Sequence, residues 1–396
     1  MKIVDLRCAV IGDHPIVRIL TDEGIVGTGQ VESSKRYLKP HVLFYRDLVL
    51  GMDPTDVERV MLGIRRLGGF KPWGSAVSAI EMALWDIAGK AAGVPVYKLL
   101  GGKIRDRVRV YLTGAPVPVT NSLPEEYAAA ARAIRELPQG YTLCKMGVSF
   151  HSGMPADVPG FFYGESSGGR WHANRGPLTE RGLKHVIACA EAMKAELGDE
   201  VGLALDCGPG MTVPDSIRLA RAVEPLNLMW LEDMITGDYV PYVLADLYRE
   251  VTRSTSTPIH TGEQIYLRQH FKELFEKQAV NVVGPDPADV GGIAETKWIA
   301  EYADLHGILM APHGVIDGLF GLAAHVHLAA TLPQNYIAFE MPGRYEESWL
   351  DMVTGLPDPI VADGHIEVWD SPGLGVEFVV EEARRHLSEE DAGFFD

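Results

Sequence analysis

The stretch that decides the fold is Gly202-Leu-Ala-Leu-Asp206, a short apolar run that ends on a carboxylate. The same pattern returns at Leu228-Met-Trp-Leu-Glu232 and at Ile259-His-Thr-Gly-Glu263. Five more apolar runs accompany these three, with helical segments between them: residues 108–112, 141–146, 280–286, 308–312 and 336–340. Apolar strands that alternate with helices predict a parallel α/β barrel. A doubly wound open sheet is the alternative, but the candidate nucleotide turn at residues 27–32 lacks a third glycine.

The first hundred residues predict a separate small unit. Residues 3–10, 16–21 and 25–31 alternate apolar and polar side chains, as strands of an antiparallel sheet do. Helices are expected to follow, most clearly over residues 75–91, where apolar side chains recur on one helical face. A sheet followed by helices is an α+β pattern.

The composition of the 396 residues excludes several classes of protein. Lys and Arg number 36 against 54 Asp and Glu, a net charge of −18, which argues against nucleic acid as a partner. The N-terminal residues lack the pattern of a signal peptide, and the most apolar later stretch is too short to span a membrane. Four scattered cysteines fit a reducing compartment. We therefore expect a cytoplasmic protein that binds neither nucleic acid nor membrane.

Polar side chains end the predicted strands, at the edge where a parallel barrel carries its catalytic groups. They are Lys145, Asp206, Glu232, Glu263, Asp286, His313 and Glu340. One carboxylate at such a position most often caps the next helix. Three successive ones, at 206, 232 and 263, would repel one another unless a divalent cation lay between them. Ligands that are all oxygen favour Mg²⁺, or Mn²⁺, over zinc.

His313 ends the strand next to the one that ends at Asp286. A carboxylate at that place can orient the imidazole and raise its basicity, as a general base requires. His325 and His327 resemble a metal motif, but residues i and i+2 of a helix point apart. We therefore expect the first pair to be catalytic and the second to be structural.

Motifs along nearly the whole chain form a set with a known counterpart. They are Ile80-Glu-Met-Ala-Leu-Trp-Asp-Ile-Ala-Gly-Lys90, Val94-Pro-Val-Tyr-Lys-Leu-Leu-Gly-Gly-Lys103, Trp230-Leu-Glu-Asp233, Thr261-Gly-Glu263, Pro285-Asp286 with Gly291-Gly-Ile293, Ala311-Pro-His-Gly314 and Pro372-Gly-Leu-Gly-Val376. As a set they resemble the enolase superfamily, and within it the mandelate racemase-like subgroup that includes the acid-sugar dehydratases.

The resemblance implies a (β/α)7β barrel with an α+β capping domain built from both chain ends. Residues 1–106 would form the capping domain, and residues 107–340 the barrel, with a long lid-like insertion at 148–177. Residues 341–396 would return to the capping domain. The resemblance also implies a homo-oligomer, a dimer or an octamer.

The same resemblance implies roles for the residues at the strand ends. Asp206, Glu232 and Glu263 look like ligands of Mg²⁺. His313 with Asp286 looks like the general-base dyad. Glu340 looks like the carboxyl group that hydrogen-bonds the developing enediolate.

The sequence after Lys145 departs from the racemases of this subgroup, which usually have Lys-x-Lys there. Gly147 replaces the second lysine and leaves space where an opposing base would lie. Asp206-Cys-Gly208 likewise lacks the Asp-x-His acid of galactonate-type and mannonate-type dehydratases, and is similar to the rhamnonate type. We therefore expect dehydration of an aldonate or aldarate, by removal of the proton α to the carboxylate and loss of the 3-hydroxyl. The product would be a 2-keto-3-deoxy acid.

Three other functions stay open. A racemase or epimerase of an α-hydroxy acid would use His313 and Lys145 on opposite faces. A non-catalytic descendant would bind a sugar acid without turning it over. A Schiff-base aldolase would use Lys145 as the nucleophile, but would leave the three carboxylates without a purpose.

The resemblance implies that loops of the capping domain close over the barrel mouth, but here the first of them shrinks to about residues 13–15. Substrate recognition is therefore expected to come from the insertion. Its candidates for polyol hydroxyls or a distal carboxylate are Tyr163, Arg170, Trp171 and His172. Arg36 and Tyr37, after the second hairpin, are further candidates outside the insertion. The alternative is that the aromatic side chains of the insertion pack it against the barrel or a neighbouring subunit.

Overall fold

The computed structural model describes residues 1–396 except 33–34, 68–73, 165–175, 236–242, 315–317 and 344–346. In this part of the chain, eight strands run parallel in one sheet, in the order β10-β9-β8-β7-β6-β5-β4-β11. They are β4 (Arg107–Thr113), β5 (Leu143–Gly147), β6 (Gly202–Asp206), β7 (Trp230–Glu232), β8 (Ile259–Thr261), β9 (Val282–Val283), β10 (Leu309–Met310) and β11 (Phe339–Pro342). The sheet closes into a barrel because Met310 N donates to Asn335 O and Ile337 N donates to Met310 O, each at 2.8 Å.

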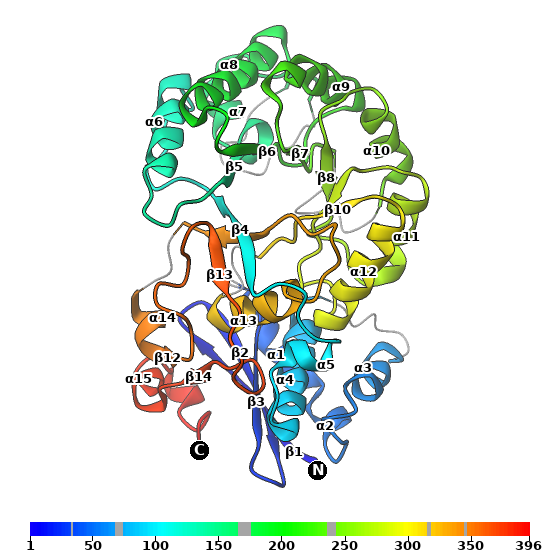
Figure 1. Cartoon of the computed structure of the whole chain (residues 1–396), viewed down its shortest axis with the longest axis vertical. Helices are drawn as coiled ribbons and strands as arrows, with labels where there is room; N and C mark the ends of the chain where they lie inside the picture. The colour runs from blue at the N-terminus through cyan, green and yellow to red at the C-terminus, as the bar shows by residue number, and fades with distance from the viewer. Residues whose placement is uncertain (33–34, 68–73, 165–175, 236–242, 315–317, 344–346) are drawn as a thin grey trace.

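Helices connect successive strands of the barrel and surround it. They are α6 (Pro124–Arg135), α8 (Glu180–Leu197), α9 (Val213–Ala222), α10 (Ala245–Thr252), α11 (Arg268–Glu276), α12 (Ile293–Leu305) and α13 (Gly318–Ala329). Figure 1 shows most of them as an arc outside the strands. The predicted (β/α)7β barrel is thereby confirmed, and the eight predicted strands lie where the apolar runs placed them.

A second core belongs to the N-terminal residues. Strands β1 (Ile3–Ile11), β2 (His14–Thr21) and β3 (Val26–Gln30) form an antiparallel sheet. Helix α4 (Ser75–Ala92) packs directly on β3, because glycine at two positions lets the backbones approach. A Cβ on Gly27 would lie 2.0 Å from Ala83 O, and one on Gly29 would lie 1.8 Å from Ala79 O. The glycines of residues 27–32 therefore serve helix packing. The described residues of this unit also form the shorter helices α1 (Lys39–Phe44), α2 (Arg46–Val49), α3 (Val57–Arg65) and α5 (Val96–Leu99).

The C-terminal residues return to this N-terminal sheet. They contain α14 (Glu347–Met352), β12 (Val353–Thr354), β13 (His365–Glu367), β14 (Glu377–Phe378) and α15 (Val380–Arg384). Arg7 Nη1 donates to the last carbonyl, Asp396 O, at 2.6 Å, and Lys39 Nζ lies 2.6 Å from Asp391 Oδ1. Both chain ends accordingly lie at the same end of the molecule, at the bottom of Figure 1.

Helix α6 begins differently from its sequence signature. Ser122-Leu-Pro-Glu125 suggests a capping box that starts at the serine. In the structure Leu123 is the N-cap, and its N–H donates to the Glu126 carboxylate at 3.1 Å. Ser122 instead has a φ of 56° and donates its hydroxyl to Asp157 at 2.7 Å. The cap therefore lies one residue later than the signature suggests, with Glu126 at the third helical position in place of Glu125, and the Glu126 carboxylate also accepts from Asn121 N at 2.9 Å.

The N-terminal sheet and its helices, called the capping unit below, contact the barrel at the start of α12. Ile293 N and Ala294 N donate to the two carboxylate oxygens of Glu81 on α4, at 2.8 and 2.9 Å. The indole N–H of Trp85 donates to Glu81 as well, at 2.7 Å. Burial raises the pKa of Glu81 to about 7, although these donors favour its ionised form. A cap residue thus satisfies the first N–H groups of a barrel helix.

We expect Glu81→Ala to lower the free energy of unfolding by roughly 2–5 kcal/mol, because it leaves one buried and two partly buried donors without their acceptor. Urea denaturation followed by circular dichroism measures the change. Glu81→Gln should cost less, since its amide oxygen still accepts. Arg59→Gln on α3 is the control, because its side chain is 78% exposed. A loss in Glu81→Ala no larger than in this control would contradict the assigned role.

Candidate functional site

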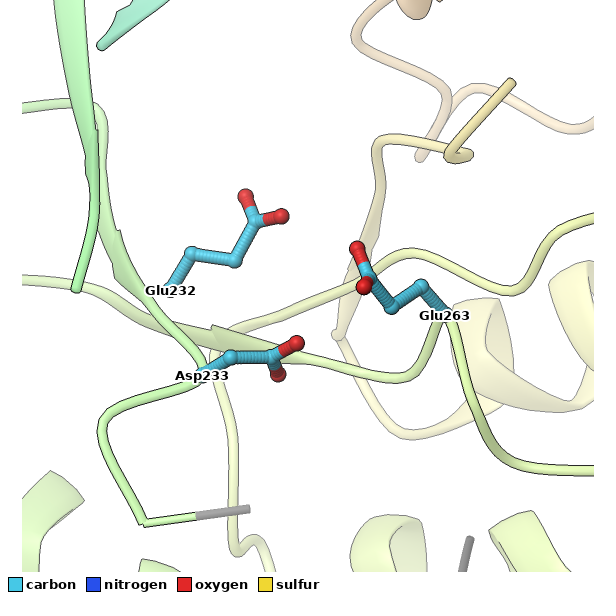
Figure 2. Close-up of side chains that lie close together, drawn as sticks. All are labelled: Glu232, Asp233 and Glu263. Atoms are coloured by element: carbon cyan, nitrogen blue, oxygen red, sulfur yellow. The ribbon is translucent and has the colours of Figure 1, made fainter. Parts of the chain in front are cut away.

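Carboxylates gather where β7 and β8 end. Glu232 is the last residue of β7, Asp233 follows it, and Glu263 lies just beyond β8. One oxygen from each lies within 4.8 Å of the others, and all three residues are buried. Figure 2 shows the side chains turned toward a common space. Asp233 was not among the residues selected from the sequence, because its φ of 50° breaks the in–out alternation of side chains along the strand. Its Oδ1 accepts a hydrogen bond from Thr261 Oγ1 at 2.5 Å.

Asp206, the first predicted ligand, ends β6 and is paired in register with Glu232. Between them lies the ammonium group of Lys145, whose Nζ is 2.5 Å from Glu232 Oε1, 3.0 Å from Glu340 Oε1 and 3.7 Å from Asp206 Oδ2. Burial alone would lower the pKa of Lys145, but these carboxylates outweigh it and hold the pKa well above its usual range. Lys145 therefore acts here as a cation among the strand-end carboxylates.

Aromatic side chains lie beneath these carboxylates, inside the barrel. The indole N–H of Trp230 donates to Glu232 Oε2 at 2.7 Å, and His260 Nδ1 lies 3.3 Å from the same oxygen. The hydroxyl of Tyr111 donates to Glu340 Oε2 at 3.1 Å. Burial lowers the pKa of His260 and so favours its neutral form. Each of the two glutamates is thus held by a donor below and by Lys145 at its other oxygen.

The predicted dyad is assembled. His313 Nδ1 lies 2.5 Å from Asp286 Oδ2, and Ala288 N donates to the other carboxylate oxygen of Asp286 at 2.7 Å. His313 Nε2 faces the carboxylates, 3.6 Å from Glu263 Oε2 and 3.7 Å from Glu340 Oε2. Burial opposes a charge on this imidazole, but the three acidic neighbours outweigh it and raise the pKa of His313 well above its usual value.

The insertion places one side chain that sequence reasoning did not select. His151, at the end of the short helix η2 (Ser149–His151), has its Nδ1 3.2 Å from Asp206 Oδ1. Among the predicted substrate residues of the insertion, Tyr163 is 72% exposed. Arg170, Trp171 and His172 lie outside the described residues. The signal for His151 was its position, four residues after Gly147 on the catalytic edge.

The two candidates from the capping unit lie on its surface. Arg36 contacts the first hairpin, with Nε 2.9 Å from Asp13 Oδ1, and Tyr37 is 66% exposed. Their neighbour Lys35 reaches the barrel instead, where its Nζ lies 2.9 Å from Asp289 Oδ2. The same ammonium group also pairs with Glu32, next to its own segment. Asp289 follows the dyad residue Asp286 on the same loop. Substrate contact by Arg36, Tyr37 and Tyr163 stays a prediction.

The two histidines of α13 do not converge on one site. Their rings face different neighbours: His325 stacks on Phe339 at 5.0 Å, and His327 Nε2 lies 3.0 Å from Leu374 O. Burial lowers the pKa of both imidazoles to about 4. They are packed, neutral side chains, as the helical spacing predicts.

The donor set suits a hard divalent cation. Glu232, Asp233 and Glu263 offer oxygen only, and Asp206 lies across Lys145 from them. Mg²⁺ and Mn²⁺ prefer such ligands, whereas zinc prefers nitrogen and sulfur. All four cysteines are free and buried, and none lies in this group. A base paired with a carboxylate beside such a group can remove a proton α to a carboxylate.

Comparison with known proteins agrees with this geometry. Residues 12–101 match the family model of the mandelate racemase/muconate lactonizing enzyme N-terminal domain, and residues 126–383 match the enolase C-terminal domain-like model. Among curated relatives, D-xylonate dehydratase of Haloferax volcanii is 33% identical and covers 99% of this chain and 90% of its own. A D-galactonate dehydratase family member of Streptomyces bingchenggensis is 31% identical, over 91% and 86%.

A solved structure shares the whole architecture. The mandelate racemase/muconate lactonizing enzyme-like protein of Rubrobacter xylanophilus superposes with a TM-score of 0.82 at 34% identity, and 98% of each chain is covered. Within the described residues, no helix is long and apolar enough to cross a membrane. The matches span both the capping unit and the barrel with its strand-end carboxylates. The chain therefore belongs to the mandelate racemase/muconate lactonizing enzyme family of the enolase superfamily.

Proposed function

We propose that this chain is a hydro-lyase that converts a sugar acid, an aldonate or an aldarate, to its 2-keto-3-deoxy acid. The observation that carries the proposal is the pairing of His313 with Asp286 beside a buried group of carboxylates. The relatives named as D-xylonate dehydratase and D-galactonate dehydratase family member support the same class of reaction. The partner is then a small anionic polyol, which an acidic protein must attract through local cations.

His313 is the proposed base. Its Nδ1 is engaged by Asp286, so Nε2 is the atom that takes the proton from C2, on the side that faces Glu263 and Glu340. The electrons of the C2–H bond move into the substrate carboxylate and form an enediolate. A positioned base of this kind contributes about 10²–10⁴-fold to the rate.

Asp206, Glu232 and Glu263 would hold Mg²⁺. When bound, a divalent cation offsets the second negative charge that develops on the substrate carboxylate, by several kcal/mol. Glu340 would hydrogen-bond the same charge in its protonated form. Burial favours that form, but the charges of Lys145 and His313 outweigh burial and lower the pKa of this carboxyl group. Lys145 Nζ, 3.0 Å from Glu340 Oε1, lies within the same cluster and brings a positive charge.

Loss of water completes the reaction. The electron pair of the enediolate forms the C2=C3 bond of an enol as the C3–O bond breaks. The departing hydroxyl takes a proton and leaves as water. The enol then tautomerises to the keto acid. The conjugate acid of His313 can supply the proton, so that elimination needs one base, whereas racemisation needs two. Lys145 is already engaged by Glu232 and Glu340 and is poorly placed to be the second.

The proposal is tested by incubating the purified protein with Mg²⁺ and a stereochemically complete set of aldonates and aldarates in D₂O. Keto acid is quantified with semicarbazide, and recovered substrate is analysed by ¹H NMR. We expect at least one acid to give a keto acid. Recovered substrate that is inverted at C2, with no keto acid formed, would replace dehydration with epimerisation. Binding of an acid without any turnover would identify a non-catalytic protein.

A further inference from the structure

His151 lies where two barrel strands end, on a short helical turn of the insertion. Its backbone N–H donates to Val148 O at 3.0 Å and to Cys207 O at 3.1 Å, which ties the turn to the ends of β5 and β6. Its imidazole Nδ1 is 3.2 Å from Asp206 Oδ1. The side chain is 20% exposed. Backbone bonds to both strands hold the imidazole at the rim of the mouth.

Two glycines make room for this residue. A Cβ on Gly147 would lie 2.9 Å from His151 O and 3.1 Å from its Cδ2. A Cβ on Gly208 would lie 2.7 Å from His151 N and 2.9 Å from its Cα and Cβ. Real Cβ atoms essentially never come within 3.0 Å of another heavy atom, and both positions have a His151 backbone atom closer than that, so any other residue at either position would displace His151. These are the two positions at which an acid or base was sought in the sequence and glycine was found.

The position of His151 is opposite that of the proposed base. In the closed ring, β7, β8 and β9 separate β6 from β10 on one side, and β5, β4 and β11 separate them on the other. His313 follows β10, and His151 is fixed to the ends of β5 and β6. The two imidazoles therefore lie on opposite sides of the mouth, with the carboxylates of β7 and β8 along one side between them.

We propose that His151 is a catalytic residue, the acid that delivers a proton to the hydroxyl leaving C3. This inference rests on the proposed dehydration and assigns its second proton transfer to His151 in place of the conjugate acid of His313. His313 takes the proton from C2, the C3–O bond breaks, and the His151 imidazolium gives its proton to the departing oxygen, so that water leaves and C2=C3 forms. The two histidines exchange protons with solvent before the next turnover. In this mechanism the hydroxyl leaves from the face of the substrate opposite His313, which is the side of the mouth where His151 lies.

The test uses the variant His151→Gln and measures removal of the C2 proton separately from loss of the 3-hydroxyl. Wild-type protein is first assayed with an acid that it dehydrates, with Mg²⁺ in D₂O. In the variant, we expect keto acid formation to fall by about 10²–10⁴-fold. The C2 proton of the substrate should still exchange with D₂O, at a rate within about threefold of the rate at which the wild-type protein removes that proton. The 3-deoxy-3-fluoro analogue should restore turnover, because fluoride leaves without a proton.

Controls keep the outcomes distinct. His365→Gln on β13 is the matched control, since β13 pairs with the N-terminal half of β4, at the end of the barrel away from the mouth. Binding of Mn²⁺, measured by electron paramagnetic resonance, reports on Asp206. Three results together would show that His151 only supports Asp206: exchange and dehydration fall together, Mn²⁺ binds more weakly, and the fluoro analogue is not turned over. The inference would then be wrong. Unchanged dehydration in His151→Gln overturns it as well. A wild-type protein that dehydrates no acid refutes the proposed function instead.

Discussion

Replacement of His313 by Asn is expected to lower kcat for sugar-acid dehydration by about 10²–10⁴-fold or more, because the residue that takes the C2 proton is lost. The substitution keeps a polar side chain of similar size next to Asp286. Deuterium exchange at C2 should disappear together with keto acid formation, which distinguishes this variant from His151→Gln. Stopped-flow or coupled assays give kcat, and ¹H NMR in D₂O gives exchange.

Asp286→Asn tests the other half of the dyad. Asp286 Oδ2 is 2.5 Å from His313 Nδ1, so an amide there removes the charge that orients the imidazole and raises its basicity. We expect a large fall in kcat with a small change in KM, because Asp286 is fully buried and acts through His313. His325→Gln is an unsuitable control because that side chain is buried, and His365→Gln serves instead. Wild-type exchange in either dyad variant would refute the role of the dyad.

The second large effect is expected on removal of the divalent cation. Dialysis against EDTA should abolish turnover, and added Mg²⁺ or Mn²⁺ should restore it, because several kcal/mol of charge stabilisation are lost without the metal. Zinc should restore less, since the ligand atoms are carboxylate oxygens. Activity and Mn²⁺ binding are measured on the same samples. Full activity after complete chelation would contradict a metal-dependent mechanism.

Single carboxamides then identify the ligands. Glu263→Gln and Asp206→Asn should each weaken Mn²⁺ binding by at least about 100-fold, more than the loss of an outer-shell partner. Asp233→Asn should have a smaller effect, since Thr261 Oγ1 already donates to its Oδ1. Glu301→Gln, 52% exposed on α12, is the control for the loss of one negative charge. If Asp233→Asn proves as damaging as Glu263→Gln, Asp233 replaces or joins Asp206 among the ligands.

The site was accessible to sequence reasoning wherever a functional side chain ends a strand. Glu232, Asp286 and Glu340 all follow apolar runs whose direction is set by the strand, so their convergence at one edge follows from the barrel itself. Lys145 could be placed at the mouth for the same reason. Its contacts with Glu232 and Glu340 could not, because they depend on how the barrel closes and on the layer of Trp230 and Tyr111 beneath.

Residues outside strands were harder to place. Arg36 and Tyr37 were selected, but Lys35 is the neighbour that reaches the barrel, because a one-residue step on a short turn changes the direction of a side chain completely. Asp233 was missed because its positive φ breaks the alternation from which inward residues are inferred. His151 was missed because the insertion has no periodicity that indicates which of its residues returns to the mouth.

The sequence by itself determined the barrel, the antiparallel sheet before it and the strand-end positions of the carboxylates and His313. It could do so because periodicity and local spacing are encoded residue by residue. Only the tertiary structure decided that Glu81 caps α12, that Lys145 lies between two carboxylates, and that Gly147 and Gly208 make room for His151. Those contacts join segments far apart in the chain, where the choice of neighbour depends on packing in three dimensions and leaves no local pattern.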